Sequence, residues 1–521
     1  SLFCRIAAGV TMTTVELTVT KLPHFIANQW QASSTSRYGD VFNPSVGRVI
    51  AQVPLGTVEE ACAAVDAAHR ALPEWAATPV VDRVKVMFKF REIMLRRFEE
   101  IARTVTREHG KTLPEARASV QRGVEVVEFA CGIPSLIMGQ TLQNIARNVD
   151  SETTRHPVGV CVGITPFNFP AMVPMWMFPV AIACGNTFIL KPSERVPMSA
   201  NLLGEMMLEA GCPAGVFNIV HGDKTVVDAL LTHEHVRAIS FVGSTAVAQY
   251  IYETGTKHGK RVQSAGGAKN HLLIMPDADL EQAAAALQAS AFGCAGERCM
   301  AGSIAVPVGK IADPLVERLR EIGGKMRTGP TDGSTAGGGG EVDMGPVITR
   351  QHQQRVAGYL DIAKGEGATL ALDGRDIPAA KSEGFFVGPS VVDHVTPGMR
   401  LAREEVFGPV LSVLRVADIS EAIEVGRNCP YGNGASIFTK SGWAARQFKM
   451  QFNAGMIGIN IGVPAPMAWF PFTGWNKSFF GDLHIQGTES ILFYTQGKTV
   501  MTRWFETADE SHHDPVWKSK R

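Results

Sequence analysis

The stretch Val158-Gly159-Val160-Cys161-Val162-Gly163-Ile164-Thr165-Pro166-Phe167-Asn168-Phe169-Pro170 opens the most regular part of this 521-residue sequence. Its first eight residues form an apolar run, which predicts a buried strand at 158–165. Downstream, runs typical of strands and of helices alternate. The predicted strands lie at 187–191, 216–220 and 238–242, and the predicted helices at 171–184, 198–210, 226–231 and 245–254. This alternation predicts an α/β fold with a parallel sheet covered by helices.

Two strand ends in this region carry polar groups suited to chemistry. Asn168 follows the first strand beside prolines, and an amide fixed there can donate a hydrogen bond to a developing oxyanion. The alternative is a turn asparagine that caps its own backbone. In Phe241-Val242-Gly243-Ser244-Thr245 a glycine and two hydroxyls mark a strand-to-helix turn. Free N–H groups and the helix dipole suit a pyrophosphate there, although the same residues also make an ordinary helix N-cap.

A second α/β unit begins at His271 and carries the candidate nucleophile, Cys299. A strand at 272–275 and an alanine-rich helix at 280–292 precede the segment Gly293-Cys294-Ala295-Gly296-Glu297-Arg298-Cys299-Met300-Ala301-Gly302-Ser303. A strand at 304–306 follows. Cys299 is therefore predicted in a tight helix-to-strand link, where small neighbours let a substrate approach. The alternative is one more buried structural cysteine.

The composition narrows the classes of function. The chain has 50 basic and 50 acidic residues, which argues against a nucleic-acid partner or an anionic membrane. Its nine cysteines include no CxxC pair and show no metal-ligand spacing, so we expect a reducing compartment and no metal. The only membrane-like run, 169–190, is interrupted by prolines and predicts a buried helix followed by a buried strand.

The remaining segments are read more coarsely. Short strands are expected within 22–55, and the pattern is helical from 58 to 116. Thr112-Leu113-Pro114-Glu115 reads as a capped helix start, and Arg122 lies in the helix that follows, where a solvated surface arginine is the alternative to a functional one. Strands are expected at 140–150 and 490–495. A glycine-rich loop is expected at 329–345, and the segment from Trp504 onward is polar.

Together these stretches resemble the aldehyde dehydrogenase superfamily. The landmarks that carry the resemblance occur in the family's order: Pro166-Phe167-Asn168-Phe169-Pro170, Lys191-Pro192-Ser193-Glu194, Phe241-Val242-Gly243-Ser244-Thr245, Cys299, and Glu404-Glu405-Val406-Phe407-Gly408-Pro409. The resemblance covers nearly the whole chain. It implies a Rossmann-type NAD-binding domain (12–136 and 158–270), a second α/β catalytic domain (271–470) and a small β oligomerisation arm (137–157 and 488–504).

The resemblance also assigns site residues. Cys299 would attack the aldehyde, and the amide of Asn168 would stabilise the oxyanion before hydride leaves to a nicotinamide cofactor. The cofactor-binding residues would be Phe167, Lys191, Glu194, Arg195, Ser244 and Glu405. Among them, Lys191 and Glu194 would hold the adenosine ribose, and a carboxylate at that ribose favours NAD over NADP. Ser244 would hold the phosphate and Glu405 the nicotinamide ribose, while a surface salt bridge is the alternative role for Arg195.

One departure from the family bears on how the acyl-enzyme is released. Hydrolytic members use a glutamate as general base, but its place falls here on Ala265, or on Ser264 if the alignment slides by one residue. Neither side chain can act as a base near neutral pH. The acyl-enzyme is therefore expected to wait for a better nucleophile, and the thiol of coenzyme A is one.

The departure resembles one branch of the family, the CoA-acylating methylmalonate-semialdehyde dehydrogenases. This implies that malonate semialdehyde or its methyl derivative is converted to acetyl-CoA or propionyl-CoA with loss of carbon dioxide or bicarbonate. Arg122 and Arg298 match the branch's two arginines for the substrate carboxylate. Arg298 is also expected to lower the pKa of the Cys299 thiol, the alternative being a salt bridge with Glu297 or another neighbour. Where the branch usually has asparagine, this chain has Ala265.

Two other functions stay open at this point. One is a hydrolytic NAD-dependent aldehyde dehydrogenase that recruits a different base. The other is a non-catalytic member of the fold that serves as a binding protein. We expect a homodimer or homotetramer in the cytoplasm, or in the mitochondrial matrix of a eukaryote. Residues 1–11, with Arg5 as their only charge, do not decide between an initiation artefact, a cloning remnant and a piece of targeting peptide.

Overall fold

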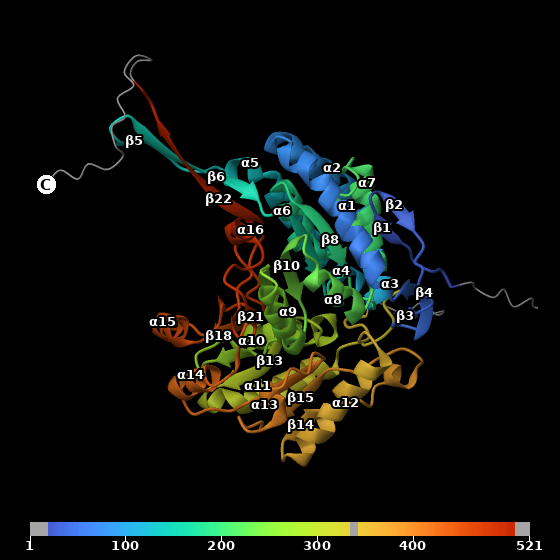
Figure 1. Ribbon diagram of the computed structural model, residues 1–521. Helices are drawn as coiled ribbons and strands as arrows, with labels where there is room; N and C mark the ends of the chain where they lie inside the picture. The colour runs from blue at the N-terminus through green and yellow to red at the C-terminus, as the bar shows by residue number, and fades with distance from the viewer. Residues whose placement is uncertain (1–18, 334–341, 506–521) are drawn as a thin grey trace, which may run out of the picture.

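The computed structural model describes residues 19–333 and 342–505, which form two lobes and a projecting arm (Figure 1). Each lobe is built on one large sheet, and the arm on a separate three-stranded sheet. Residues 1–11, the glycine run at 337–340 and the tail beyond 505 lie outside the described residues.

The first lobe contains an eight-stranded sheet in the order β2-β1-β9-β8-β7-β10-β11-β21. Its five central strands are parallel, and the remaining strands pair antiparallel at the two edges. The strands are β1 (His24–Ile26), β2 (Gln29–Gln31), β7 (Val160–Ile164), β8 (Thr187–Lys191), β9 (Phe217–Ile219), β10 (Val236–Val242), β11 (Arg261–Ala265) and β21 (Phe479–Phe480).

The order of the parallel strands reverses between β7 and β10. The chain moves outward from β7 through β8 to β9, then returns to place β10 on the other side of β7. In open α/β sheets ligands bind at the carboxyl ends of the strands beside such a reversal. The loops that carry Asn168 and Ser244 leave from the carboxyl ends of β7 and β10.

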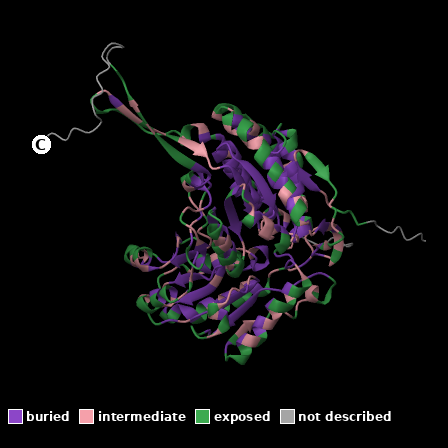
Figure 2. Cartoon of the chain, in the orientation of Figure 1, coloured by how far each residue is buried: buried purple, intermediate pink, exposed green. Residues whose placement is uncertain are grey.

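Helices cover both faces of this sheet and bury its apolar strands (Figure 2). Two separate apolar clusters fill the two faces. One face is covered by α2 (Val80–Arg96), α3 (Phe98–His109), α4 (Leu113–Cys131), α6 (Met172–Ala183) and α7 (Met198–Glu209), and the other by α1 (Val58–Ala77), α8 (Lys224–Thr232) and α9 (Thr245–Lys257). Every residue of α6 is buried, which explains the membrane-like run in the sequence.

The second lobe contains a seven-stranded sheet in the order β14-β15-β16-β13-β12-β18-β19, in which only β14 is antiparallel. Its strands are β12 (Asn270–Ile274), β13 (Gly302–Pro307), β14 (Thr369–Leu372), β15 (Ser390–Asp393), β16 (Val410–Val413), β18 (Gly434–Phe438) and β19 (Met456–Ile459). The helices around it are α10 (Leu280–Phe292), α11 (Ala312–Gly324), α12 (Arg350–Gly365), α13 (Arg400–Arg403), α14 (Ile419–Arg427) and α15 (Gly442–Gln451).

The arm joins two segments that are far apart in the sequence. Strand β6 (Val149–Pro157) pairs antiparallel with β5 (Thr141–Ala146) and with β22 (Thr495–Arg503), and the three strands project from the first lobe (Figure 1). The predicted strand at 140–150 is confirmed, with a turn at 147–148. The strand predicted at 490–495 is wrong, because Gly487–Tyr494 is helix α16 and strand structure begins only at Thr495.

The error at α16 has a clear cause. Ile491, Phe493 and Tyr494 are buried, and the helix packs against α6. A short apolar run of this length does not distinguish a buried strand from a buried helix. The other predicted strands and helices of the first lobe are confirmed, with ends shifted by up to three residues. The predicted helix start at Thr112 is a complete capping box with Glu115.

No helix among the described residues is long and apolar enough to cross a membrane.

Candidate active site

Cys299 lies in an irregular loop between α10 and β13, as the sequence predicted. A single 3-10 turn, η1 (Gly293–Gly296), follows α10, and its backbone is unusual: Cys294 and Ala295 both have φ of 51°. Gly296 also has a positive φ of 71°, and a Cβ there would meet the Gly408 carbonyl oxygen at 2.2 Å. The loop thus depends on glycine at this position to pack against the segment that carries Glu405.

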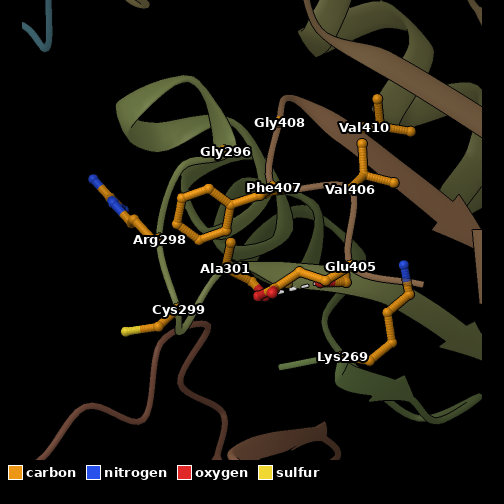
Figure 3. A pocket seen from close by; sticks show the side chains of 13 residues that line it. Lys269, Gly296, Arg298, Cys299, Ala301, Glu405, Val406, Phe407, Gly408 and Val410 are labelled. Carbon is orange, nitrogen blue, oxygen red and sulfur yellow. Dashed lines mark hydrogen bonds between the residues drawn. The ribbon is translucent and has the colours of Figure 1, made fainter. Parts of the chain in front are cut away.

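Two asparagine side chains fix the backbone at the candidate nucleophile. The carbonyl oxygen of Cys299 accepts hydrogen bonds from Nδ2 of Asn270 at 2.8 Å and Nδ2 of Asn433 at 2.9 Å. Asn270 begins β12, and Asn433 immediately precedes β18. The loop is therefore anchored to the amino ends of two central strands, which leaves the half-buried Cys299 side chain beside a small pocket. That pocket is lined by residues that include Lys269, Gly296, Arg298, Cys299, Glu405 and Phe407 (Figure 3).

The free thiol of Cys299 is not activated by its neighbours. Burial raises its pKa to about 12, and the negative charge of Glu405 adds to the shift. Arg298 acts in the expected direction, but its contribution is smaller than these effects. The expected lowering of the Cys299 pKa by Arg298 is therefore confirmed in direction, but burial and Glu405 outweigh it, so the net pKa is raised. Burial also raises the pKa of Glu405 to about 7, although the backbone N–H of Ala268 donates to its carboxylate at 3.0 Å.

Arg298 lines the pocket, and α4 holds its guanidinium. Nη2 lies 3.4 Å from Oε1 of Glu115, and Nε lies 3.3 Å from Sγ of Cys294. The salt bridge thus forms with Glu115, not with Glu297. The same Glu115 oxygen accepts the backbone N–H of Cys294 at 2.6 Å. One carboxylate at the start of α4 therefore holds both the unusual backbone of the loop and the arginine beside the candidate nucleophile.

Arg122 lies farther along the same helix. Its Nη1 is 3.0 Å from Oε2 of Glu125 and 2.7 Å from Sδ of Met467, and its side chain is 43% exposed. Seven residues of helix separate it from Glu115, which corresponds to about 10 Å along the axis. Arg122 does not line the pocket around Cys299, and its described contacts are those of a partly exposed arginine.

Asn168 is buried and connects the two lobes. Its Nδ2 donates to the backbone carbonyl of Glu297 at 3.0 Å, two residues before Cys299. The backbone carbonyl of Asn168 accepts from Nζ of the buried Lys111 at 2.6 Å. The side chain therefore does not cap its own turn. An amide nitrogen carries two N–H groups, and this bond to Glu297 uses one of them.

The predicted cofactor residues gather at the carboxyl ends of the first sheet. Lys191 ends β8, and its Nζ is 3.3 Å from Oε2 of Glu194. Burial alone would raise the pKa of Glu194, but Lys191, a backbone hydrogen bond and Arg195 together keep that pKa below its ordinary value. Ser244 is the N-cap residue of α9, and its hydroxyl makes no capping hydrogen bond. A paired carboxylate and ammonium, with a helix N-terminus nearby, fit a dinucleotide.

Phe167 links this cofactor region to the pocket. Its ring makes an edge-to-face contact with Phe407, with centroids 5.7 Å apart, and the guanidinium of Arg195 lies 5.5 Å from its centroid. Arg195 thus stacks on an aromatic ring, an arrangement that favours arginine over lysine.

Several residues at the site were not predicted from the sequence. They are His109 at the end of α3, Lys111 in the link before α4, His352 in α12, and Glu115, which the sequence predicted only as part of a helix cap. Their signal is three-dimensional, since each is a polar side chain buried beside a segment that is distant in the sequence. Nothing in the local pattern around them indicates that position.

The fold and this site define the class of protein. A cysteine loop faces the switch point of a dinucleotide-type sheet, and the model of the aldehyde dehydrogenase family matches residues 30–500. The chain belongs to that family.

Individual members of the family are similar to this chain over almost its whole length. Malonate-semialdehyde dehydrogenase 3 of Geobacillus kaustophilus is 51% identical over 489 residues, which cover 94% of this chain and 100% of the relative. The methylmalonate-semialdehyde dehydrogenase of Oceanimonas doudoroffii has a crystal structure that is 47% identical, with a TM-score of 0.91 over 94% of this chain and 99% of that one. A structure from Sinorhizobium meliloti 1021, solved with NAD, is 45% identical with a TM-score of 0.92 over 95% of this chain and 100% of that one.

Proposed function

We propose that this protein catalyses the NAD-dependent, CoA-acylating oxidation of malonate semialdehyde or methylmalonate semialdehyde. The products are acetyl-CoA or propionyl-CoA, carbon dioxide or bicarbonate, and NADH. One observation carries the proposal: the pocket of Cys299 contains Arg298, while the two positions where the hydrolytic base would fall, Ala265 and Ser264 at the end of β11, carry a buried methyl group and a buried hydroxyl that donates to the Ala248 carbonyl. The names of the relatives agree with this substrate class.

The cofactor would lie across the carboxyl ends of the first sheet. Glu194 and Lys191 would hold the adenosine ribose, Ser244 and the N-terminus of α9 the phosphates, and Glu405 the nicotinamide ribose, with Phe167 and Arg195 bordering the site. When bound, NAD supplies an acceptor for the aldehyde hydride.

The bond changes at the substrate fall to three groups. Cys299 releases its thiol proton to solvent and its Sγ bonds to the carbonyl carbon, while the free N–H of Asn168 donates to the oxygen as it becomes an oxyanion. Arg298 binds the substrate carboxylate through a forked pair of hydrogen bonds, and Arg122 would supply a second cation. In exchange, Arg298 gives up part of its interaction with Glu115.

Two further steps complete the turnover. Once Cys299 holds the acyl group as a thioester, the carboxylate lies β to the thioester carbonyl. The C–C bond breaks, its electron pair forms an enolate that the thioester and Asn168 stabilise, and carbon dioxide leaves. After protonation of the enolate, the CoA thiolate attacks the thioester carbonyl and Cys299 departs as thiolate.

The decisive experiment measures NADH production from malonate semialdehyde with and without CoA, with products identified by mass spectrometry. Strict dependence on CoA and an acetyl-CoA product are expected. A free acid formed equally fast without CoA would establish a hydrolytic dehydrogenase in its place. Verified NAD binding with no NADH formed from any aldehyde would establish a non-catalytic binding protein.

The three-stranded arm supports the proposed assembly. Leu142, Ile145 and Met501 on its strands are more than half exposed, at 58%, 52% and 59%. Exposed apolar side chains on a projecting sheet are typical of a subunit contact. We propose that the arm (137–157 and 488–504) joins copies of this chain into a homodimer or homotetramer, beside a cofactor domain (12–136 and 158–270) and a catalytic domain (271–470). Sedimentation of Leu142→Asp/Ile145→Asp should show smaller particles than wild type.

A further inference from the structure

Glu297 is completely buried and lies two residues before Cys299. Its Oε1 accepts the backbone N–H of Ile348 at 3.1 Å and lies 3.6 Å from Nε2 of His352. Its Oε2 lies 3.7 Å from Nε2 of His109, which is also completely buried. The carboxyl group thus sits between α3 and α12, away from the pocket that holds the thiol.

The two groups that face each other have unmet hydrogen-bonding capacity. Within residues 19–333 and 342–505, Oε2 of Glu297 and both ring nitrogens of His109 have no hydrogen-bond partner. A buried polar atom left in this state destabilises the folded chain. A proton on Oε2 would let Glu297 donate to Nε2 of His109 and would satisfy one atom of each residue after a small closure of the 3.7 Å separation.

The surroundings favour that proton. Burial raises the pKa of Glu297 to about 8, against the opposing effects of the Ile348 N–H, Lys111 and Arg195. Burial also lowers the pKa of His109 well below its ordinary value and that of His352 to about 4. At pH 7 Glu297 is therefore mainly a neutral acid between neutral imidazoles, and Lys111 and Arg195 are the cations that face it.

Glu297 is connected to the pocket and to Asn168 in two ways, through His352 and through its own backbone carbonyl. Nε2 of His352 also contacts the Phe407 carbonyl at 2.6 Å, so it carries the proton, since a carbonyl can only accept. Phe407 lines the pocket of Cys299. The backbone carbonyl of Glu297 itself accepts from the Asn168 amide. A shift of Glu297 would therefore move the amide and the pocket wall together.

We propose that Glu297 is a positioning residue, which by its contacts with His109 and His352 holds in place the carbonyl that orients the Asn168 amide. This inference rests on the proposed function, in which Asn168 stabilises the oxyanion. The neutral acid is the competent form. Its ionisation places an unpaired charge in the buried cluster and releases the carbonyl.

The test compares wild type with Glu297→Gln between pH 7 and 9. Glutamine reproduces the neutral acid, because its NH2 donates to His109 and its oxygen accepts from Ile348. The fraction of Glu297 in the neutral form falls about tenfold per pH unit above its pKa. The kcat ratio of Glu297→Gln to wild type should therefore rise severalfold, up to about tenfold, from pH 7 to 9, and groups common to both enzymes cancel in that ratio. A constant ratio would overturn the proposal.

Glu108→Gln is the matched control. Glu108 is also a fully buried carboxyl whose pKa burial raises, to about 7, but it binds the backbone N–H groups of Met198 and Ser199, away from the cysteine loop. Its kcat ratio to wild type should stay constant with pH. If the kcat ratio of Glu108→Gln to wild type rose with pH in the same way, the effect would reflect a general loss of structure, and the proposal would be overturned.

A second readout needs no turnover. The rate at which iodoacetamide alkylates Cys299 should change with pH differently in Glu297→Gln and in wild type, since the loop is released only in wild type. Identical profiles would contradict the positioning role. If wild type forms no NADH from any semialdehyde, the proposed function fails, whereas a working wild type with a flat kcat ratio fails only this inference.

Discussion

The cofactor side and the nucleophile loop are built in opposite ways. Lys191, Glu194 and Ser244 stand at or just after the ends of regular parallel strands, where the sheet itself brings them together. Cys299 stands in a loop with three residues of positive φ, held by side chains from α3, α4, α12, β12 and the link before β18. The first site is a product of topology. The second depends on individual polar contacts across the lobes, so single substitutions far from Cys299 should affect its chemistry.

The largest effect is expected at the nucleophile. Cys299→Ser should lower NADH formation at least about 1000-fold, because a serine hydroxyl with no adjacent base is a much weaker nucleophile than a thiol. Cys62→Ser, at a half-buried cysteine of α1, should retain wild-type activity and serves as the control. If Cys299→Ser formed NADH within tenfold of the wild-type rate, Cys299 would not be the nucleophile.

The amide that bridges the lobes should rank next. Asn168→Ala removes the proposed oxyanion donor and should lower kcat about 100-fold, with less change in KM, as for other lost oxyanion donors. Asn201→Ala, a buried asparagine that binds the Pro23 carbonyl and His221, is the control, with kcat near that of wild type. A fall in affinity alone at Asn168 would indicate a binding role.

The cofactor side should respond in binding, not in the chemical step. Glu194→Gln should raise the KM for NAD about tenfold at unchanged kcat, the loss expected for one hydrogen bond to a charged group. It should also weaken the preference for NAD over NADP, which lacks a free ribose hydroxyl at that position. Initial-rate measurements with NAD and with NADP test this prediction. An unchanged KM for NAD would mean that Glu194 does not bind the adenosine ribose.

The smallest effect compares two equivalent helix caps. Thr57 and Thr112 both complete capping boxes, with Glu60 and Glu115, at the starts of α1 and α4. Replacing either threonine by alanine should lower the free energy of unfolding by about 1 kcal/mol, measured by denaturant titration. Only Thr112→Ala also loosens Glu115, the partner of Arg298, so it alone should raise the KM for the semialdehyde. An equal KM for the semialdehyde in the two variants would mean that the start of α4 does not support the substrate site.

The same contrast decides what could be predicted from the sequence. The strands and helices of the first lobe, and the place of Cys299 in its link, follow from periodicity and from small residues. The net pKa of Cys299 and the partner of Arg298 do not, because both depend on burial and on Glu115 and Glu405, which are distant in the sequence. The helix at 487–494 was not predicted for a related reason: its apolar run has no clear period, and its packing against α6 cannot be read from the local sequence.

The arm has a consequence for biosynthesis. Asp150 and the indole nitrogen of Trp504 are 2.9 Å apart although 354 positions separate them. Strand β6 therefore emerges from the ribosome long before its partner β22, and until then it exposes an unpaired edge. Such an edge is prone to wrong pairing, so a nascent chain of this protein has a defined period in which a chaperone can protect it. The subunit contacts that we propose for the arm need β22 in place, so on that proposal assembly follows translation of residues 495–503.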